Sequence, residues 1–481
     1  MPVSAPQANA PSPSLQRAIS PLQFVALGFG SIVGSAWAVL LGDWLRQAGP
    51  GGAMIGIAAG AAAMALIAAF YAELGSRFPQ TGGEVTYINA VFGKRLAFVA
   101  GWMLTLAFMC VTVFEGVALV WLLEILWPPI VGPILYDILG QPIGLGGLLV
   151  ALASAAVIAT LNYRGARALV RFQSVLTAAF ILIVGVIVVV ELYYGSARNI
   201  LPVWRTGNGT HWWVGAAWVF ASAPYILSGF QSILQAIEER SPSTSNETVV
   251  RLVFVAIAAA AVFYWLVLTG AAMAAPWMSL TSSDFPAAAA LAHLPWSRAL
   301  TAALLISLIA SVLKTWNGMF MIAVRLLLAQ AKAGMIPEFF GGINPRTQTP
   351  DRAVIVVAVF NLTGLFFGKG ALEPIVSMTS LCFALCYVLC CAAALTMRRR
   401  SPHHAGFRVP GGTPAGVVAI GFSLAIAGLA LARPYQSGQA DTLKWVLLGS
   451  WAALGLGFYY CARNRKPPAR QPADSRIGAE P

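Results

Sequence analysis

Long apolar runs separated by short polar segments dominate this chain, and their lengths predict its fold. A helix needs about 20 apolar residues to cross the hydrocarbon of a bilayer. Runs of that length begin near Pro21, Gly51, Ala97, Ile143, Leu169, Trp212, Val249, Ala299, Ala353, Pro374, Ala415 and Leu443. The pattern therefore predicts an all-α polytopic membrane protein with about 12 transmembrane helices.

The first run, from about Pro21 to Leu45, is interrupted by the small residues Gly28, Gly30, Gly34 and Ser35. Each glycine weakens a helix interior by about 0.8–1 kcal/mol. Because an opened turn has no water to bond in hydrocarbon, it is tolerated only where protein buries it or a cavity wets it. We therefore predict a break at mid-membrane, with a helix-packing motif of small residues as the alternative.

The run from about His211 to Ile237 is also interrupted near its middle. Pro224 lacks a backbone donor and clashes with the preceding turn, and Gly229 follows a few residues later. Two broken helices at corresponding places in two halves of a chain are typical of a transporter's binding site. The sequence thus indicates that the two interrupted runs face each other.

Composition and charge support a membrane protein. Hydrophobic residues make up 58% of the 481 residues and charged residues 10%, which is too apolar for a soluble enzyme of this length. Most of the 30 Lys and Arg fall in alternate loops, as the positive-inside rule requires if both termini are cytoplasmic. The net charge of +13 therefore reflects topology, and no nucleic-acid partner is expected.

Ionisable side chains at mid-membrane are candidates for function, since they are rare there and usually face a cavity. Glu115 lies deep in the third run and Lys314 in the middle of the eighth. Either could instead belong to a structural pair or to a polar contact between helices. A third group of charges, at the predicted cytoplasmic ends of helices, could form a salt-bridged inner gate: Glu73, Glu238, Glu239 and Arg325.

The cysteines indicate neither a disulfide framework nor a metal centre. All six fall in predicted spans, and Cys382, Cys386 and Cys390 share one helix face at a spacing of four. Small packing residues explain this stripe better than metal ligands do. No arrangement of nucleophile and base indicates an enzyme, and no cofactor is expected.

Five segments resemble the amino acid-polyamine-organocation (APC) superfamily of permeases. They are GSIVGSAW in the first run, AELGSRFPQTGGEVTYINAVFGK after the second, GFQSILQAIEE from Gly229, RLLLAQAKAGMIPEFFGGINPRTQTP after the eighth and FRVPGG from Phe407. The resemblance covers about residues 20 to 465 in the expected order. It implies the leucine-transporter fold, in which helices one to five and six to ten are inverted repeats and two helices follow.

The composition of the two ends and the resemblance together predict a division of the chain. A cytoplasmic tail at 1–20 is expected to be disordered, as is a second tail at 466–481. Between them, 21–465 would form one permease domain, with repeats at 21–195 and 210–396 and the two additional helices at 413–462. Substrate would bind between the broken first and sixth helices, where helix-end amides starting near Ser35 meet a carboxylate and carbonyls near Pro224 meet an ammonium group.

Four positions depart from the family pattern. Ala36 stands where many relatives have Gly, and Trp37 replaces a smaller aliphatic residue. Gln231 stands where the family often has a carboxylate, and Phe180 where many proton-coupled relatives carry a fifth-helix Lys. Lys314 on the eighth helix, which borders the cation site in this fold, could replace that Lys or a sodium ion.

We therefore expect a secondary transporter of amino acids or related amines in the inner membrane, working by alternating access with protons as the coupling ion. Exchange of an amino acid for its amine is the alternative, and a non-transporting sensor is the rival from another class. Glu115 makes cationic substrates credible. The expected substrate contacts are Gly30, Ser31, Ile32, Val33, Gly34, Ser35, Ala36, Trp37, Glu115, Phe220, Ala223, Tyr225, Ser228 and Gly229, and the coupling candidates are Lys314, Thr315 and Glu115.

Overall fold

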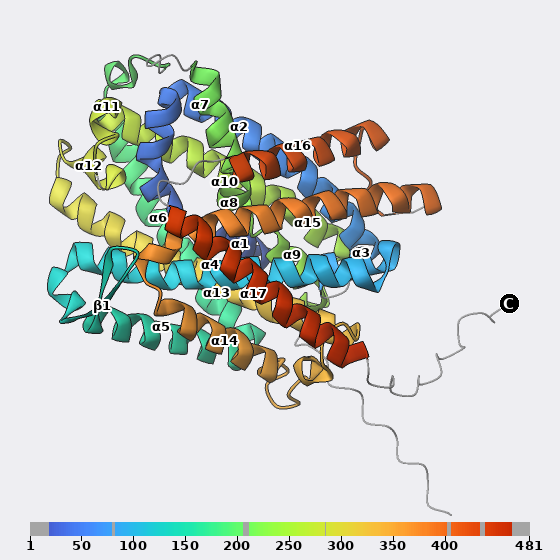
Figure 1. Cartoon of the computed structure of the whole chain (residues 1–481). Helices are drawn as coiled ribbons and strands as arrows, with labels where there is room; N and C mark the ends of the chain where they lie inside the picture. The colour runs from blue at the N-terminus through green and yellow to red at the C-terminus, as the bar shows by residue number, and fades with distance from the viewer. Residues whose placement is uncertain are drawn as a thin grey trace, which may run out of the picture.

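Helices account for nearly all the regular structure. The computed structural model describes residues 19–78, 82–204, 211–283, 285–401, 406–432 and 438–463, and in these residues the only sheet is a two-stranded hairpin. Figure 1 shows long helices side by side in a bundle, with short helices and loops at its ends. The all-α polytopic class predicted from the apolar runs is confirmed.

Ten helical stretches of the described chain are long and apolar enough to cross a membrane. They are Pro21–Ala38, Leu40–Arg77, Lys94–Leu126, Leu145–Tyr163, Val170–Tyr194, Asn246–Ala274, Ser297–Lys332, Met378–Arg400, Gly412–Leu429 and Thr442–Arg463. Two predicted spans take shorter forms: the run from Trp212 is divided among three helices, and the run from Ala353 is the 15-residue helix α14 (Asp351–Leu365). Every predicted apolar run is therefore a helix or a broken helix.

The first span is broken within the stretch that the small residues predicted. Helix α1 (Pro21–Ile32) and helix α2 (Ala36–Arg77) are separated by residues 33–35. Gly28 and Gly30 lie inside α1, so they pack against neighbouring helices and do not open the turn. The break is therefore shorter than the small-residue pattern suggested.

Helix α2 contains both the second half of the first span and the whole second span. Gly49 has φ 68° and ψ 171°, which are not helical angles, and Pro50 follows it. Glycine adopts a positive φ without a steric penalty, and proline is tolerated at the start of a helix. The chain turns sharply here between two membrane crossings.

The sixth span consists of α7 (Trp212–Ala221), α8 (Ala223–Leu227) and α9 (Gln231–Gln235). Pro224 lies in the first turn of α8, where its missing amide would have no helical partner anyway. The wide break comes later, at Gly229, which has φ 110°. The first half of this span therefore ends at Leu227 rather than near Pro224, about one helical turn beyond the predicted end.

The centre of the bundle is formed by α1 and the four helices around it. These are α4 (Lys94–Leu126), α6 (Ala166–Tyr194), α10 (Asn246–Ala274) and α13 (Ser297–Lys332). Helix α1 contacts α6, α10 and α13, and α13 also packs along α4. Residues 314–331 of α13 are all buried, which places this part of the helix inside protein on every side.

The remaining long helices surround this centre. Helix α5 (Leu145–Tyr163) packs against α14, and α15 (Leu372–Arg400) packs against α4 and α16 (Gly412–Ala432). Helix α17 (Gly438–Arg463) contacts α15 and α4. In Figure 1, α16 and α17 cross the outside of the bundle.

One end of the bundle, on the left in Figure 1, carries the hairpin of β1 (Ile134–Ile138) and β2 (Gln141–Gly144), and we call it the hairpin end. The sequence predicts one short surface helix between the seventh and eighth spans, and two form there, α11 (Trp277–Leu280) and α12 (Pro286–Leu291). Short 3-10 helices complete this end: η1 (Pro128–Val131), η2 (Ala197–Ile200) and η5 (Lys369–Ala371).

The opposite end, on the right in Figure 1, carries α3 (Gly83–Phe92), and we call it the α3 end. Two 3-10 helices, η3 (Ile237–Glu239) and η4 (Glu338–Gly341), lie beyond α9 and α13. Residues 1–18 and 464–481 lie outside the described residues, and with them most of the two tails expected at 1–20 and 466–481.

Candidate substrate and ion site

The break in the first span exposes backbone groups in the middle of the bundle. Val33 ends α1 with an extended conformation, and its amide bonds the Phe29 carbonyl. Helix α2 begins at Ala36 after Ser35, whose side chain makes no capping bond. The first amides of α2 have no partner within the helix and carry the positive end of its dipole. This end of α2 attracts a negative group such as a carboxylate.

The two broken spans touch each other. A Cβ added to Gly229 would lie 2.6 Å from the Ser31 carbonyl carbon and 2.9 Å from the Ile32 amide nitrogen. No side chain fits at that distance, so only glycine allows the backbones to approach so closely. The predicted juxtaposition of the two interrupted runs is thus present in the structure.

Helix α13 supplies polar groups to the carbonyls freed by the break. The Lys314 ammonium donates to the Gly30 carbonyl at 3.2 Å and to the Val33 carbonyl. The Thr315 hydroxyl donates to the same two carbonyls, at 3.0 and 3.3 Å. The Ser311 hydroxyl donates to the Val33 carbonyl at 3.2 Å. The lysine ammonium and the two hydroxyls of α13 therefore donate to the same two carbonyls.

These oxygens are hard donors of the kind that bind small cations, and the Lys314 side chain supplies the positive charge among them. Lys314 is fully buried, and its ammonium lies 4.6 Å from the centre of the Phe180 ring. Phe180 is the position where the resemblance implied a fifth-helix Lys. The aromatic face stabilises a cation that reaches it from the eighth span instead.

Glu115 faces the same break from α4. Its Oε2 is buried without a hydrogen-bond partner, and a Cβ added to Gly34 would lie 3.0 Å from its Oε1. Its carboxylate interacts electrostatically with Lys314 and with Tyr225. The Tyr225 ring also packs edge-on against Phe114, 5.7 Å between ring centres. Glu115 thus lies against Gly34 at the break and interacts electrostatically with both Lys314 and Tyr225.

Tyr264 of α10 joins both breaks, and the sequence analysis missed it. Its hydroxyl donates to the Ile226 carbonyl at 2.8 Å and approaches the Ile32 carbonyl at 3.5 Å. Tyr264 is 1% exposed, so this hydroxyl has no access to water. A lone tyrosine in an apolar run was the available signal, but tyrosine is common in buried helices and the signal is weak.

A chain of side-chain amides behind α1 was also missed. Asn162 donates to Asn317 at 3.1 Å, and Asn317 donates to Gln173 at 3.1 Å. A Cβ added to Gly30 would lie 2.5 Å from the Gln173 Nε2, which explains why this position of α1 is glycine. The available signal was the spacing of Asn317, which follows Lys314 by three residues and is a second polar residue inside the same apolar run.

Three other predicted substrate contacts, Trp37, Ser31 and Ser228, lie in or next to the broken spans. Trp37 is buried against a ring of α10, and its Nε1 has no hydrogen-bond partner. Ser31 is buried with an unpartnered Oγ that faces Gly318 of α13. The Ser228 amide donates to the Pro224 carbonyl at the end of α8.

Two predicted side chains point elsewhere. Phe220 packs against a phenylalanine of α16, and the Ala223 methyl lies against Gly60 of α2. Their side chains therefore face α16 and the second span rather than the first break. Their backbone remains in the broken sixth span.

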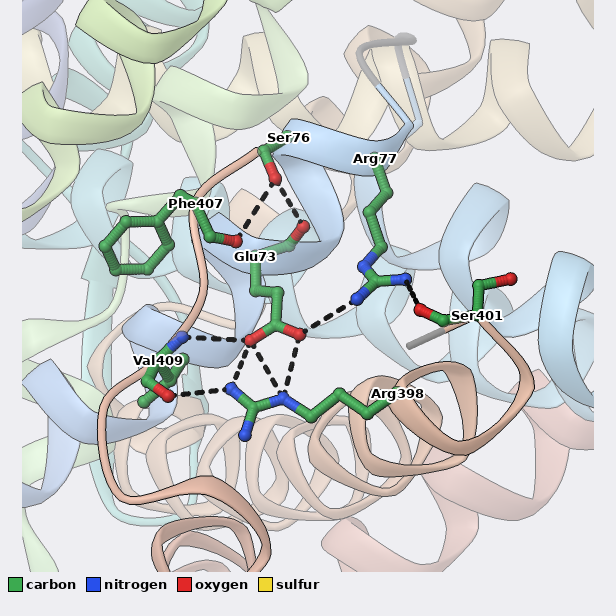
Figure 2. Close-up of polar contacts among 7 residues, drawn as sticks. All are labelled: Glu73, Ser76, Arg77, Arg398, Ser401, Phe407 and Val409. Atoms are coloured by element: carbon green, nitrogen blue, oxygen red, sulfur yellow. Dashed lines mark hydrogen bonds and ion pairs between the residues drawn. The ribbon is translucent and has the colours of Figure 1, made fainter. Parts of the chain in front are cut away.

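The α3 end is held together by buried ion pairs, as Figure 2 shows for one of them. The fully buried Glu73 carboxylate at the end of α2 accepts hydrogen bonds from Arg398 of α15 and from the Val409 amide. Arg77 approaches the same carboxylate at 3.4 Å and donates to the Ser401 carbonyl. These contacts fasten α2 to the end of α15 and to the FRVPGG segment.

A second buried pair joins Arg325 of α13 to Glu239 in η3. Burial raises the pKa of Glu239, and the Arg325 guanidinium opposes that shift. The chain before α1 is fixed to the same place, since the Ile19 amide donates to the Glu239 carbonyl at 3.0 Å. Three of the four charged residues that suggested a gate, Glu73, Glu239 and Arg325, thus form ion pairs between separate elements.

Comparison with known proteins shows the family of this chain. The family model described as amino acid permease matches residues 19–452. The chain is 27% identical over 473 residues to the methylthioribose transporter of Bacillus subtilis (strain 168), covering 95% of this chain and 96% of that one.

Other similar proteins carry different substrates in their names. The glutamate/serine transporter AimA of the same bacterium is 28% identical over 478 residues, covering 94% of this chain and 83% of its own. The human cationic amino acid transporter 4 is 27% identical over 400 residues, covering 80% of this chain and 60% of its own. Similarity across this group therefore extends over proteins with chemically different substrates.

Proposed function

The chain belongs to the amino acid permease family of the APC superfamily, and we propose that it is a secondary active transporter of amino acids or related amines that works by alternating access. One observation carries this proposal: two broken helices meet at Gly229 and Ser31, with polar groups of α13 on the freed carbonyls. Such backbone has no role in a purely structural helix, because intact helices satisfy their own hydrogen bonds. The arrangement leaves charged helix ends for a ligand.

Substrate recognition follows from the polarity of these ends. The first amides of α2, at Ser35 and Ala36, would receive the carboxylate of an amino acid. The carbonyls at the end of α8, near Leu227 and Ser228, would receive its ammonium group. Because these contacts use only backbone, they read the zwitterion shared by all amino acids, and side chains around the break set the preference.

Glu115 is the side chain that we propose as the determinant of substrate charge. It is buried next to Gly34, with one oxygen unpartnered. A buried carboxylate favours a cationic group in its vicinity. Cationic amino acids and polyamines are therefore included among the proposed substrates.

Lys314 is the proposed coupling residue. Its ammonium donates to the carbonyls freed by the break, where another cation would otherwise be needed to compensate them. A lysine that loses and regains its proton during transport would release and reform these contacts. We therefore propose proton-coupled symport first. Thr315 would assist Lys314, because its hydroxyl donates to the same carbonyls.

The proposed location is the inner membrane, with both termini and the α3 end at the cytoplasmic face. The distribution of Lys and Arg along the sequence supports this orientation. The ion pairs of Glu73 with Arg398 and of Glu239 with Arg325 would then close the inner side. They would have to separate, or move with their helices, when that side opens.

Uptake into proteoliposomes tests the proposal. The purified chain is reconstituted and given a panel of labelled amino acids and polyamines, with and without an inward proton gradient. Accumulation driven by the gradient is the expected result. Uptake only into liposomes preloaded with an amine or amino acid would establish exchange instead, and absence of flux for every substrate would favour a sensor.

Lys314→Met is the decisive variant for coupling. We expect it to lose gradient-driven accumulation, while substrate binding measured without a gradient is retained in part. Lys332→Met is the matched control, because Lys332 is an exposed lysine at the end of the same helix. Unchanged pH dependence of transport by Lys314→Met would exclude Lys314 as the coupling residue.

A further inference from the structure

Glu84 is a buried carboxylate at the α3 end that the proposed substrate and ion site does not use. It lies in the first turn of α3 and is 1% exposed. Its Oε2 accepts a hydrogen bond from the Gln235 side chain of α9, whereas its Oε1 is buried with no partner. An ionised carboxylate normally has all its oxygens hydrated or bonded, so this environment disfavours the charged form.

No positive charge of the described chain compensates Glu84. The titratable groups that face it are Tyr71 from α2, Tyr87 from α3, and Tyr387 and Cys390 from α15. None of them is a cation. Helices α13 and α4 pack against the neighbouring residues of α3 through Ala329 and Gly101, which carry no charge either.

The surroundings of Glu84 connect α3 to the broken sixth span. Gln235, which donates to Glu84, also accepts a hydrogen bond from the Gly82 amide at 3.1 Å. One turn earlier, Gln231 accepts from the Gly229 amide at the break and donates to the Tyr387 hydroxyl. The hydrogen bonds between α3 and α9 therefore connect α3 to the half of the sixth span that follows the break.

We propose that Glu84 is a proton-binding site, separate from Lys314, that holds its proton while α3 is packed on α9 and loses it when the two separate and water enters. A protonated carboxyl group can donate one hydrogen bond and needs no countercharge, which suits the buried position. The bound proton thus favours the closed α3 end. This inference does not require that protons drive substrate uptake.

The direction of the pH effect follows from burial. Burial raises the pKa of Glu84 from an ordinary value of 4.5 to about 7, against smaller opposing effects of its own backbone amide and of the bond from Gln235. With the ordinary value in the open, hydrated state, closure is favoured at low pH and weakens as the pH rises through about 7. Between about pH 5.5 and about pH 8.5 the equilibrium should move roughly 30-fold toward opening.

Hydrogen exchange of the full chain in proteoliposomes tests this inference. Amide protection of α3 and α9 is measured by mass spectrometry across this pH range, with labelling times scaled to the intrinsic exchange rate. We expect protection of both helices to fall with rising pH in the wild type. In Glu84→Gln, which is neutral at every pH, protection should stay high and independent of pH.

Two further variants complete the test. Glu247→Gln, at an exposed carboxylate paired with Arg251, should behave like the wild type. Gln235→Met removes the bond that stabilises the charged carboxylate, so it should move the transition to higher pH even if it also lowers overall stability. A transition with unchanged midpoint in Glu84→Gln would overturn the inference.

This result is independent of the test of transport. If Lys314→Met abolishes coupling and α3 still titrates, both proposals stand. If no proton-driven uptake exists but the Glu84-dependent transition is present, only the coupling proposal fails.

Discussion

The contact between the two broken helices makes a prediction about a single methyl group. In Gly229→Ala the new Cβ would lie 2.6 Å from the Ser31 carbonyl carbon and oxygen, so the two backbones must separate. The neighbouring atoms are backbone rather than flexible side-chain ends, and they cannot rotate away. We expect the substitution to lower both the thermal stability of the protein and its transport rate.

The expected loss of folding stability in Gly229→Ala has two contributions. A residue other than glycine held at a φ of 110° is strained by about 1–3 kcal/mol. Inserting a methyl group into a tightly packed place costs about 1–3 kcal/mol more. The sum is about 2–6 kcal/mol, which is a large part of the stability of an ordinary domain.

The assay compares Gly229→Ala with Gly185→Ala. Gly185 lies in α6 with nothing within 4 Å of an added Cβ, so its replacement should be neutral or stabilise by up to about 1 kcal/mol. Thermal unfolding in detergent, followed by tryptophan fluorescence, gives the stability of both variants. Uptake into proteoliposomes gives their activity.

Equal unfolding temperatures for the two glycine variants would refute the reasoning. That result would mean that the α9 half of the sixth span shifts freely relative to α1. An unchanged unfolding temperature together with lost transport would likewise contradict the energetic argument, because the contact would then act on function without contributing to stability.

Two further predictions concern buried polar groups. Tyr264→Phe leaves the Ile226 carbonyl without its donor, so it should destabilise the protein by about 1–3 kcal/mol and reduce uptake, whereas Tyr193→Phe at an exposed site should do neither. Arg325→Met leaves Glu239 buried and unpaired, and should cost about 3–5 kcal/mol at neutral pH. Because burial already raises the pKa of Glu239 and Arg325 opposes this, the variant should regain stability as the pH falls and the carboxyl is protonated, and Glu239→Gln added to it should restore stability at neutral pH. Thermal unfolding as a function of pH checks both, and a pH-independent defect in Arg325→Met would contradict the second.

Prediction from the sequence succeeded where the signal is local. The span-length runs became helices or broken helices, and the break at Gly34 and Ser35 lies where small residues interrupt an apolar run. Hydrophobic length and helix propensity act over a few residues, so they are visible without a fold. The position of the sixth break was displaced, because Pro224 is compatible with the first turn of α8.

The sequence did not predict the partners of the charged residues. Glu73 was predicted to lie near a gate, but its partner Arg398 is 325 positions away and the Val409 amide is 336 positions away. In the sequence, Glu84 stands out only as part of the AELGSRFPQTGGEVTYINAVFGK segment, although it is among the most buried carboxylates of the described chain. Burial depends on which helices cover a turn, and a turn with Pro and Gly nearby looks exposed in sequence.

The sequence by itself therefore determined that this chain crosses a membrane repeatedly, that two of its helices are broken, and that Glu115 and Lys314 lie inside long apolar helices. The tertiary structure alone decided that Lys314 meets carbonyls of residues 284 and 281 positions away, and that Gly229 touches Ser31. The physical reason is range: hydrophobicity and backbone strain are properties of a short segment, whereas a hydrogen bond between distant residues exists only after packing has placed both helices.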